Sequence, residues 1–210
     1  MTGAFITLEG GDGSGKSTQA GMLQAWLEGE GRTVVRTREP GGTELGVEIR
    51  RLVQHTEGHV APRAEALLYA ADRAHHVATL VRPALERGEV VLQDRYLDSS
   101  VAYQGAGREL DGGQIRDLSL WAADGLLPDL TILLDLDPAA GRERMAARED
   151  APYDRLEEAG EAFALRVRQA YLELAAAEPD RFAVVDASGS PADVHARVVS
   201  HVRAMLDADR

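Results

Sequence analysis

The chain has 210 residues and no cysteine, and its 35 acidic residues outnumber the 23 basic ones, giving a formal net charge of −12. This length predicts one domain with a sizeable core. The acidic balance argues against a broad nucleic-acid-binding surface, and the lack of cysteine excludes a disulfide scaffold. No apolar run reaches membrane-spanning length and the first residues lack a signal-peptide layout, so we expect a soluble cytoplasmic protein with no membrane partner.

Short apolar, β-rich runs alternate with helical patterns along the chain. The expected strands cover residues 4–8, 33–35, 90–92, 130–134 and 182–185. The expected helices cover residues 15–28, 44–54, 62–87, 114–123, 138–148, 158–177 and 192–207. This alternation predicts an α/β fold, a five-stranded parallel sheet with helices on both faces, in a single domain over residues 1–210. Ligands of such sheets bind at the carboxyl ends of the strands.

The first strand runs into a glycine-rich loop with the spacing G-x-x-x-x-G-K-[ST], and a helical pattern follows at once. Strand, loop and helix together are the context that a phosphate-binding loop requires. The residues assigned to this ATP-binding loop are Gly10, Gly11, Asp12, Gly13, Ser14, Gly15, Lys16, Ser17 and Thr18. Its glycines let several backbone N–H groups point at one anion, next to the positive end of the helix dipole.

Lys16 is the only lysine in a chain whose other basic residues are all arginine. A compact ammonium fits between phosphate oxygens, where a planar guanidinium would not. We therefore expect Lys16 to reach the β- and γ-phosphates of a nucleotide, and the Ser17 hydroxyl to hold Mg²⁺.

The second and third strands also end in chemistry-bearing residues. Thr37-Arg38-Glu39-Pro40-Gly41-Gly42-Thr43 places Arg38 on the phosphate side of the sheet before a sharp turn. The third strand ends in Asp94-Arg95-Tyr96, where Asp94 resembles a carboxylate that holds Mg²⁺ through water and Arg95 lies beside it. The next segment carries Ser99, Ser100, Tyr103 and Gln104. Their hydroxyl, phenol and amide groups suit hydrogen bonds to a base edge and a sugar.

The long helix carries Tyr69 and Arg73 four residues apart, on one face, where a ring and a guanidinium suit a nucleotide base. Taken alone, the pair also fits a tyrosine at the edge of the core and a surface arginine. Neither of the two histidine pairs has the pattern of a helical metal site. We therefore expect all four to be surface residues: His55, His59, His75 and His76.

After the fourth strand, Arg142, Arg144 and Arg148 lead into a polar segment that ends at Arg155. Arginines before an irregular flap are typical of a lid that closes over phosphates and excludes water. The alternative is an arginine-rich surface helix. The fifth strand ends in the loop 186–190, which is placed to border a nucleotide base.

Together these motifs resemble the thymidylate kinase family over nearly the whole chain. The resemblance is carried by the loop, TREPGGT at 37–43, YAADR at 69–73, DRY at 94–96, AYQG at 102–105 and the lid arginines. It implies a P-loop NTPase-type three-layer fold with a small lid at about residues 148–158. It also implies transfer of the γ-phosphoryl group of ATP to dTMP with Mg²⁺, and a homodimer.

The resemblance also assigns roles to individual residues. The residues implied to bind dTMP are Arg38, Arg50 and Arg95 at the phosphate, Tyr69 stacked on thymine, Arg73 and Gln104 at the base edge, Ser100 in the base pocket, and Tyr103 at the sugar. Asp12 is implied to contact the 3′-hydroxyl and orient Arg95, and Arg144 to lie over adenine. Lys16, Arg95, Asp12 and one lid arginine form the implied catalytic set. Arg148 is our choice for that arginine, with Arg155 second.

Two other functions fit parts of the pattern. A GTP-dependent switch would share the phosphate loop, but it commonly reads guanine with N-K-x-D, and this chain has no asparagine and no second lysine. A kinase for another nucleoside monophosphate, such as UMP or dGMP, is the nearer alternative.

Overall fold

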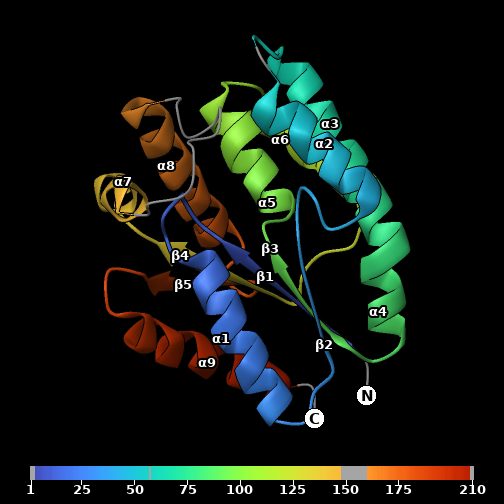
Figure 1. Ribbon diagram of the computed structural model, residues 1–210, viewed down its shortest axis with the longest axis vertical. Coiled ribbons are helices and arrows are strands. Elements are labelled where there is room, and N and C mark those ends of the chain that lie inside the picture. Colours follow the sequence, from blue (N-terminus) through green and yellow to red (C-terminus); the bar gives the residue numbers. More distant parts are fainter. Residues whose placement is uncertain (1–2, 57, 148–159, 209–210) are drawn as a thin grey trace.

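A computed structural model describes residues 3–56, 58–147 and 160–208 of the chain, and its centre is one parallel β-sheet (Figure 1). The strand order is β2-β3-β1-β4-β5. The strands are β1 (Ala4–Glu9), β2 (Val34–Arg38), β3 (Val90–Asp94), β4 (Leu130–Asp135) and β5 (Phe182–Asp186). All five runs expected to be strands are strands, and every paired neighbour is parallel. Four of them end one or two residues later than expected, and β2 begins one residue later and ends three residues later.

Helices cover both faces of the sheet, as expected (Figure 1). The described helices are α1 (Lys16–Gly29), α2 (Glu44–His55), α3 (Pro62–His76), the π-helical η1 (Val77–Val81), α4 (Arg82–Glu86), α5 (Leu97–Ser100), the π-helical η2 (Val101–Gly107), α6 (Gly112–Ala122), α7 (Pro138–Ala146), α8 (Glu161–Ala177) and α9 (Pro191–Ala208). Helices α1 and α9 pack against each other on one face, whereas α4 and α8 pack on the other. None of these helices is both long and apolar enough to cross a membrane.

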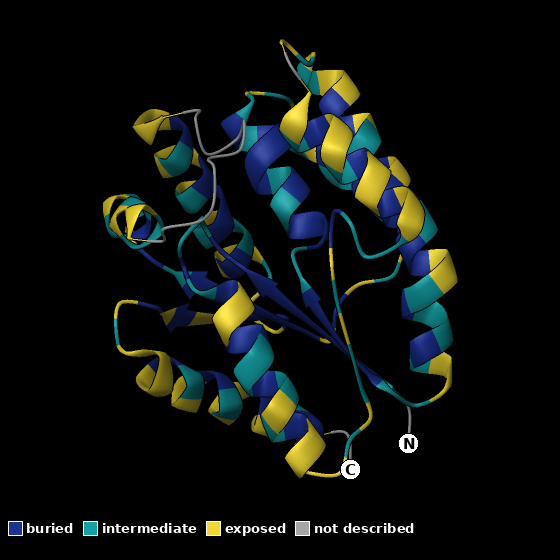
Figure 2. Ribbon diagram, viewed as in Figure 1, coloured by how far each residue is buried: buried dark blue, intermediate teal, exposed yellow. Residues whose placement is uncertain are grey.

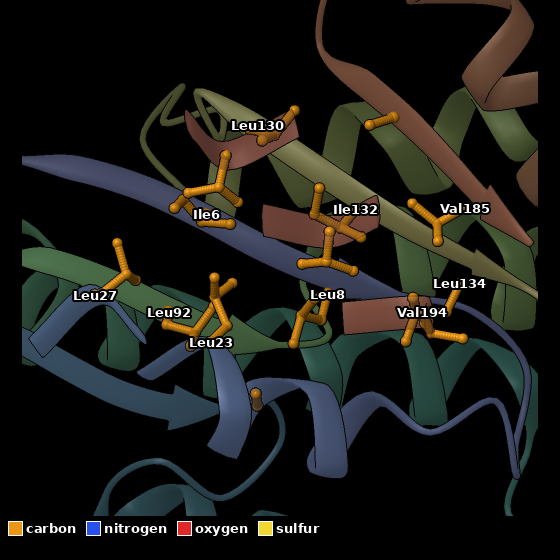
Figure 3. Packing of buried hydrophobic residues seen from close by; sticks show 14 of the residues in the cluster. Ile6, Leu8, Leu23, Leu27, Leu92, Leu130, Ile132, Leu134, Val185 and Val194 are labelled. Carbon is orange, nitrogen blue, oxygen red and sulfur yellow. The ribbon is translucent and has the colours of Figure 1, made fainter. Parts of the chain in front are cut away.

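The central strands are buried on both sides, because helices cover both faces and alternate residues of a strand point to opposite faces. Ile6 and Leu8 of β1 join Leu23 and Leu27 of α1 in the largest core cluster, and all four side chains are fully buried (Figure 3). Phe5, the residue before Ile6, belongs to a separate cluster on the opposite face. Figure 2 shows β1, β3 and β4 as almost wholly buried, whereas the edge strands β2 and β5 carry exposed residues and the helices expose their outer faces.

Two helical segments differ from the expected pattern. The single helix expected at residues 62–87 is divided into α3, a π-helical turn and α4. Pro83 follows this turn and explains it, because proline has no N–H to donate and its ring crowds the preceding turn.

Helices α5 and η2 were not predicted at all. The segment carries two serines, a β-branched Val101 and the glycines at 105 and 107, all poor helix formers. Its stability comes from packing, since η2 contacts both α8 and α6 closely. Gly107 is required there, because a Cβ at this position would lie 2.6 Å from the Phe163 ring of α8.

Candidate active site

The glycine-rich loop lies between β1 and α1, at the carboxyl edge of the sheet (Figure 1). Gly10, Gly13 and Gly15 all have positive φ, with values of 136°, 76° and 96°. Gly13 also packs tightly on α7: a Cβ there would lie 2.2 Å from the carbonyl oxygen of Gly141. Only glycine fits this position, so the loop and α7 are held against each other.

Lys16 is the first residue of α1, and its side chain folds back into the loop. Its Nζ donates to the carbonyl oxygens of Gly10 at 3.0 Å and Gly11 at 2.8 Å. Burial lowers the pKa of Lys16 to about 8, and the Arg95 charge adds to this shift, while Asp94 and Asp12 oppose it. A buried ammonium whose present partners are neutral carbonyls gains from the arrival of a polyanion.

Ser17 and Asp94 meet across the two central strands. Leu8 of β1 is in register with Asp94 of β3, and the Ser17 Oγ donates to Asp94 Oδ2 at 3.2 Å. This places a hydroxyl and a carboxylate oxygen side by side at the mouth of the loop. Hard oxygen donors of this kind suit Mg²⁺, which keeps several waters and takes its other ligands from phosphates. Within the described ranges, three or more acidic or histidine side chains never gather in a metal-binding group.

Arg95 joins the loop to the end of β3. It has a positive φ of 67°, unusual for a residue other than glycine, and this turns its guanidinium back toward the loop. Its Nη2 donates to Asp12 Oδ1 and, at 3.0 Å, to the Tyr103 hydroxyl, which in turn donates to Asp12 Oδ2 at 3.1 Å. Its Nη1 donates to the Gly10 carbonyl at 3.2 Å.

The Asp12 carboxylate is ionised in this arrangement. Burial acts to raise the pKa of Asp12, but the Arg95 guanidinium and the Lys16 ammonium overcome it and lower the pKa below its usual value. Asp12, Arg95 and Tyr103 therefore form a closed triangle of hydrogen bonds that fixes the guanidinium beside Lys16.

Behind Arg95 lies a buried carboxylate, Glu9, at the end of β1. Its Oε1 accepts from the backbone N–H of Tyr96 at 2.7 Å, and its Oε2 accepts from the hydroxyls of Ser99 at 2.6 Å and Tyr171 at 2.7 Å. Both hydroxyls also lie within 3.4 Å of Arg95 Nη1. Glu9 therefore holds the turn that carries Arg95.

The other end of the site is built on α3. Arg73 is fully buried, with Nε donating to Glu39 Oε2 at 3.0 Å, Nη1 to Ser119 Oγ at 3.1 Å, and Nη2 to the Tyr96 carbonyl at 3.2 Å and to Ser100 Oγ at 3.1 Å. Gln104 of η2 is also buried, and its Nε2 donates to Glu65 Oε1 at 2.9 Å. Both side chains are held rigidly by carboxylates.

One histidine prediction is wrong. His76 is buried, not on the surface: its Nδ1 lies 2.9 Å from Glu39 Oε1 and its Nε2 lies 2.7 Å from Thr37 Oγ1. The spacing of His75 and His76 excluded a metal pair, but it could not show that the second ring faces the buried Glu39. His55 and His59 are exposed, and His75 is half-buried.

These groups surround one cavity of about 250 Å³. The predicted site residues that line it are Asp12, Gly13, Gly15, Lys16, Ser17, Arg38, Arg50, Tyr69, Arg73, Asp94, Arg95, Tyr103 and Gln104. Arg38 is exposed at the rim, and Arg50 Nη1 donates to the Pro40 carbonyl at 3.0 Å. The loop ammonium and three arginines from separate segments, Arg38, Arg73 and Arg95, thus line a common space.

Other predicted residues do not line this cavity. Ser100 lies behind it, in contact with Arg73. Arg144 of α7 donates to the carbonyls of Ala187 at 2.9 Å and Ser188 at 3.3 Å, in the loop after β5 that was expected to border a base. Arg148, Arg155 and the expected lid at about 148–158 lie outside the described residues.

The sequence profile of the thymidylate kinase family, described as "Thymidylate kinase", matches residues 8–198 of this chain. The chain belongs to the thymidylate kinase family. It is 67% identical over 208 residues to a protein named thymidylate kinase from Clavibacter michiganensis subsp. michiganensis, covering 99% of this chain and 98% of that protein. A thymidylate kinase from Leifsonia xyli subsp. xyli is 70% identical over 196 residues, with 93% and 92% covered.

A solved structure agrees with this assignment. The crystal structure of thymidylate kinase from Ehrlichia chaffeensis has a TM-score of 0.78 to this chain at 31% sequence identity, and the match covers 96% of this chain and 99% of that one. At this level of similarity the P-loop NTPase-type fold of the family is shared as a whole.

Four residues that hold the site were not predicted from the sequence. Glu9, Glu39, Glu65 and Tyr171 are buried polar side chains that contact a cavity-lining residue or its turn. For Glu65 a signal was present, since Glu65, Tyr69 and Arg73 recur every four residues and so share one helix face. For Tyr171 there was none, because α8 is brought to Ser99 only by the tertiary fold.

Glu9 is expected to make the stability of the folded protein depend on pH. Burial raises the pKa of Glu9 to about 7, helped by the Asp98 charge and opposed by the Ser99 hydrogen bond and the Arg95 charge. A raised carboxyl pKa contributes stability that is complete below the unfolded pKa and is lost as pH rises through the folded pKa. Between about pH 5 and about pH 8, wild type should lose roughly 1–3 kcal/mol relative to Glu9→Gln, which cannot ionise.

Urea unfolding of both proteins across this pH range measures the effect. Glu173→Gln, which removes an exposed carboxylate from α8, is the matched control. If the wild-type and Glu9→Gln curves stay parallel from acid to neutral pH, Glu9 is ionised in the folded protein throughout and the interpretation is wrong.

Proposed function

We propose that this chain transfers the γ-phosphoryl group of ATP to dTMP, giving dTDP and ADP, in the synthesis of dTTP. Membership of the thymidylate kinase family over nearly the whole chain supports this proposal. The single structural observation that carries it is the cavity that Lys16 lines together with Arg38, Arg73 and Arg95. One ammonium in a ring of backbone amides suits the donor, and converging arginines suit an anionic acceptor.

The donor end is the loop from Gly10 to Thr18. Its backbone N–H groups and the N-terminus of α1 would hold the β- and γ-phosphates, and Lys16 would exchange its two carbonyl partners for phosphate oxygens. Arg144, fixed on the loop after β5, would lie over adenine.

Ser17 and Asp94 fit Mg²⁺, since their oxygens lie 3.2 Å apart at the mouth of the loop. When bound with ATP, the ion would neutralise charge on the β- and γ-phosphates. Asp94 would hold it through water, and the Ser17 hydroxyl would hold it directly.

The acceptor end follows from the Asp12–Arg95–Tyr103 triangle. Arg95 would bind the dTMP phosphate with help from Arg38 and, at the rim, Arg50. Asp12 would contact the 3′-hydroxyl of the sugar, and the Tyr103 ring would crowd the 2′ position and disfavour ribose. Tyr69 would stack on thymine, with Arg73 and Gln104 at the base edge.

The chemistry requires positioning and charge neutralisation rather than a general base. The attacking atom is a phosphate oxygen that is already ionised near neutral pH. Lys16 and Arg95 hold the two phosphates in line, and their charges stabilise the negative charge that spreads over the transferred group. Arg148, in the lid, would complete this field and exclude water.

We also propose that the chain acts in the cytoplasm as a homodimer. Three neighbouring helices, α2, α3 and α6, carry exposed apolar side chains. The largest exposures are 81% for Trp121, 58% for Leu67, 51% for Val47 and 47% for Leu45. Apolar side chains gathered on one set of helices suit a second copy of the chain.

The nearer alternative is a kinase for another nucleoside monophosphate, such as UMP or dGMP. A coupled ADP-release assay across the deoxy- and ribonucleoside monophosphates distinguishes a dTMP kinase from a kinase for another nucleoside monophosphate. We expect release with dTMP and, more weakly, with dUMP, since one missing methyl in an apolar pocket is worth only about 1–3 kcal/mol. Release with none of them would favour a binding protein, such as a GTP-dependent switch.

The lid assignment is tested with two arginine variants. Arg148→Ala should reduce kcat by about 10³–10⁵-fold, because an arginine that neutralises transition-state charge contributes on that scale. Arg155→Ala is the matched control and should keep most of kcat, while Lys16→Met serves as the inactive reference. A wild-type kcat for Arg148→Ala at saturating substrates, with the loss found in Arg155→Ala instead, would move the role to Arg155.

A further inference from the structure

Gln104 lies at the base end of the cavity with its amide held in one orientation. The side chain is 1% exposed and lines the cavity, and its Nε2 donates to Glu65 Oε1 at 2.9 Å. In the described part of the chain the Gln104 side chain makes no other hydrogen bond. With Nε2 turned toward Glu65, the carbonyl oxygen Oε1 is the acceptor left for a ligand.

The contact with Glu65 determines which end of the Gln104 amide faces the cavity. It is fully buried on α3 and forms an ion pair with Arg108, whose Nε and Nη2 each lie 3.3 Å from a carboxylate oxygen. Beside this guanidinium the carboxylate is ionised, and an ionised carboxylate accepts hydrogen bonds but cannot donate them. The Gln104 amide must therefore present its NH₂ group to Glu65, and the reversed orientation would set two acceptors against each other.

Arg73 supplies the complementary group. Its Nε and both hydrogens of Nη2 are used by Glu39, the Tyr96 carbonyl and Ser100, and Nη1 gives one hydrogen to Ser119. One N–H of Nη1 is left over. The base end of the cavity thus offers one donor from Arg73 and one acceptor from Gln104, and neither can reverse its role.

We infer that Glu65 is a positioning residue that sets base specificity by locking the Gln104 amide with its carbonyl toward the base. This inference rests on the proposed function. An acceptor beside a donor matches a base in which a ring N–H lies next to a carbonyl, as in uracil and thymine. It opposes cytosine, in which the ring nitrogen is an acceptor and the neighbouring group is an amine.

The test compares dUMP with dCMP, because neither carries the methyl group and they differ only in this hydrogen-bonding edge. In Glu65→Gln the new amide can accept or donate, so Gln104 is free to turn over. We expect the ratio of kcat/KM for dUMP to that for dCMP to fall about tenfold or more. Part of the fall should come from a rise for dCMP, which damage to the pocket alone would not produce.

Arg108→Lys is the matched control. It breaks the two-point contact with Glu65 but keeps a positive charge there, so Glu65 still holds the amide and the ratio should stay near wild type. In a Gln104→Ala background, Glu65→Gln should not change the ratio further, because the residue through which it acts is gone. Melting temperatures of all variants report on the fold.

The outcomes separate this inference from the function itself. If wild type phosphorylates dTMP and dUMP but a folded Glu65→Gln keeps the wild-type ratio, the inference is wrong and the proposed function stands. If wild type phosphorylates none of these nucleotides, the proposed function fails. If Glu65→Gln does not fold, the exchange of Glu65→Gln with Gln104→Glu keeps one carboxylate, one amide and an acceptor toward the base. It should retain the dUMP preference, and loss of that preference overturns the inference.

Discussion

The contact between Asp12 and Arg95 is the interaction on which the rest of the site depends. Asp12 belongs to the glycine-rich loop and Arg95 to the turn after β3, so this ion pair joins the loop proposed to bind the donor to the arginine proposed to bind the acceptor. It exists because β1 and β3 are adjacent and parallel, which brings both carboxyl ends to one edge of the sheet. Two phosphates that must meet in line can then be held by groups that are already fixed relative to each other.

A second feature is that buried carboxylates hold the ligand-facing groups from behind. Glu9 holds the turn of Arg95, Glu39 holds Arg73, and Glu65 holds Gln104. Each carboxyl group is almost fully buried, and its hydrogen bonds to several donors offset part of the cost of burying it. The groups that face the cavity therefore have fixed directions before any ligand arrives, and this reduces the cost of ordering them on binding.

The sequence predicted the sheet, most helices and the loop because each has a local signal. The apolar runs, the G-x-x-x-x-G-K-[ST] spacing and the strand ends at Arg38 and Asp94 can be read without knowing the fold. The helical segments α5 and η2 could not be predicted in this way, because their residues are poor helix formers. Packing of η2 on α8 and α6 stabilises them. The buried place of His76 was missed for a related reason: only the tertiary fold brings Glu39 and Thr37 to its ring.

A crystal structure with a dinucleoside pentaphosphate, in which thymidine and adenosine are joined through their 5′ oxygens, would show which side chain meets each phosphate. We expect the phosphate next to thymidine to contact Arg95 while Arg95 still contacts Asp12, and Lys16 to contact phosphates nearer adenosine. We expect thymine to lie between Tyr69 and the Arg73–Gln104 pair. A complex in which Arg95 turns away from the phosphate chain, or in which the two nucleosides occupy the opposite ends, would contradict it.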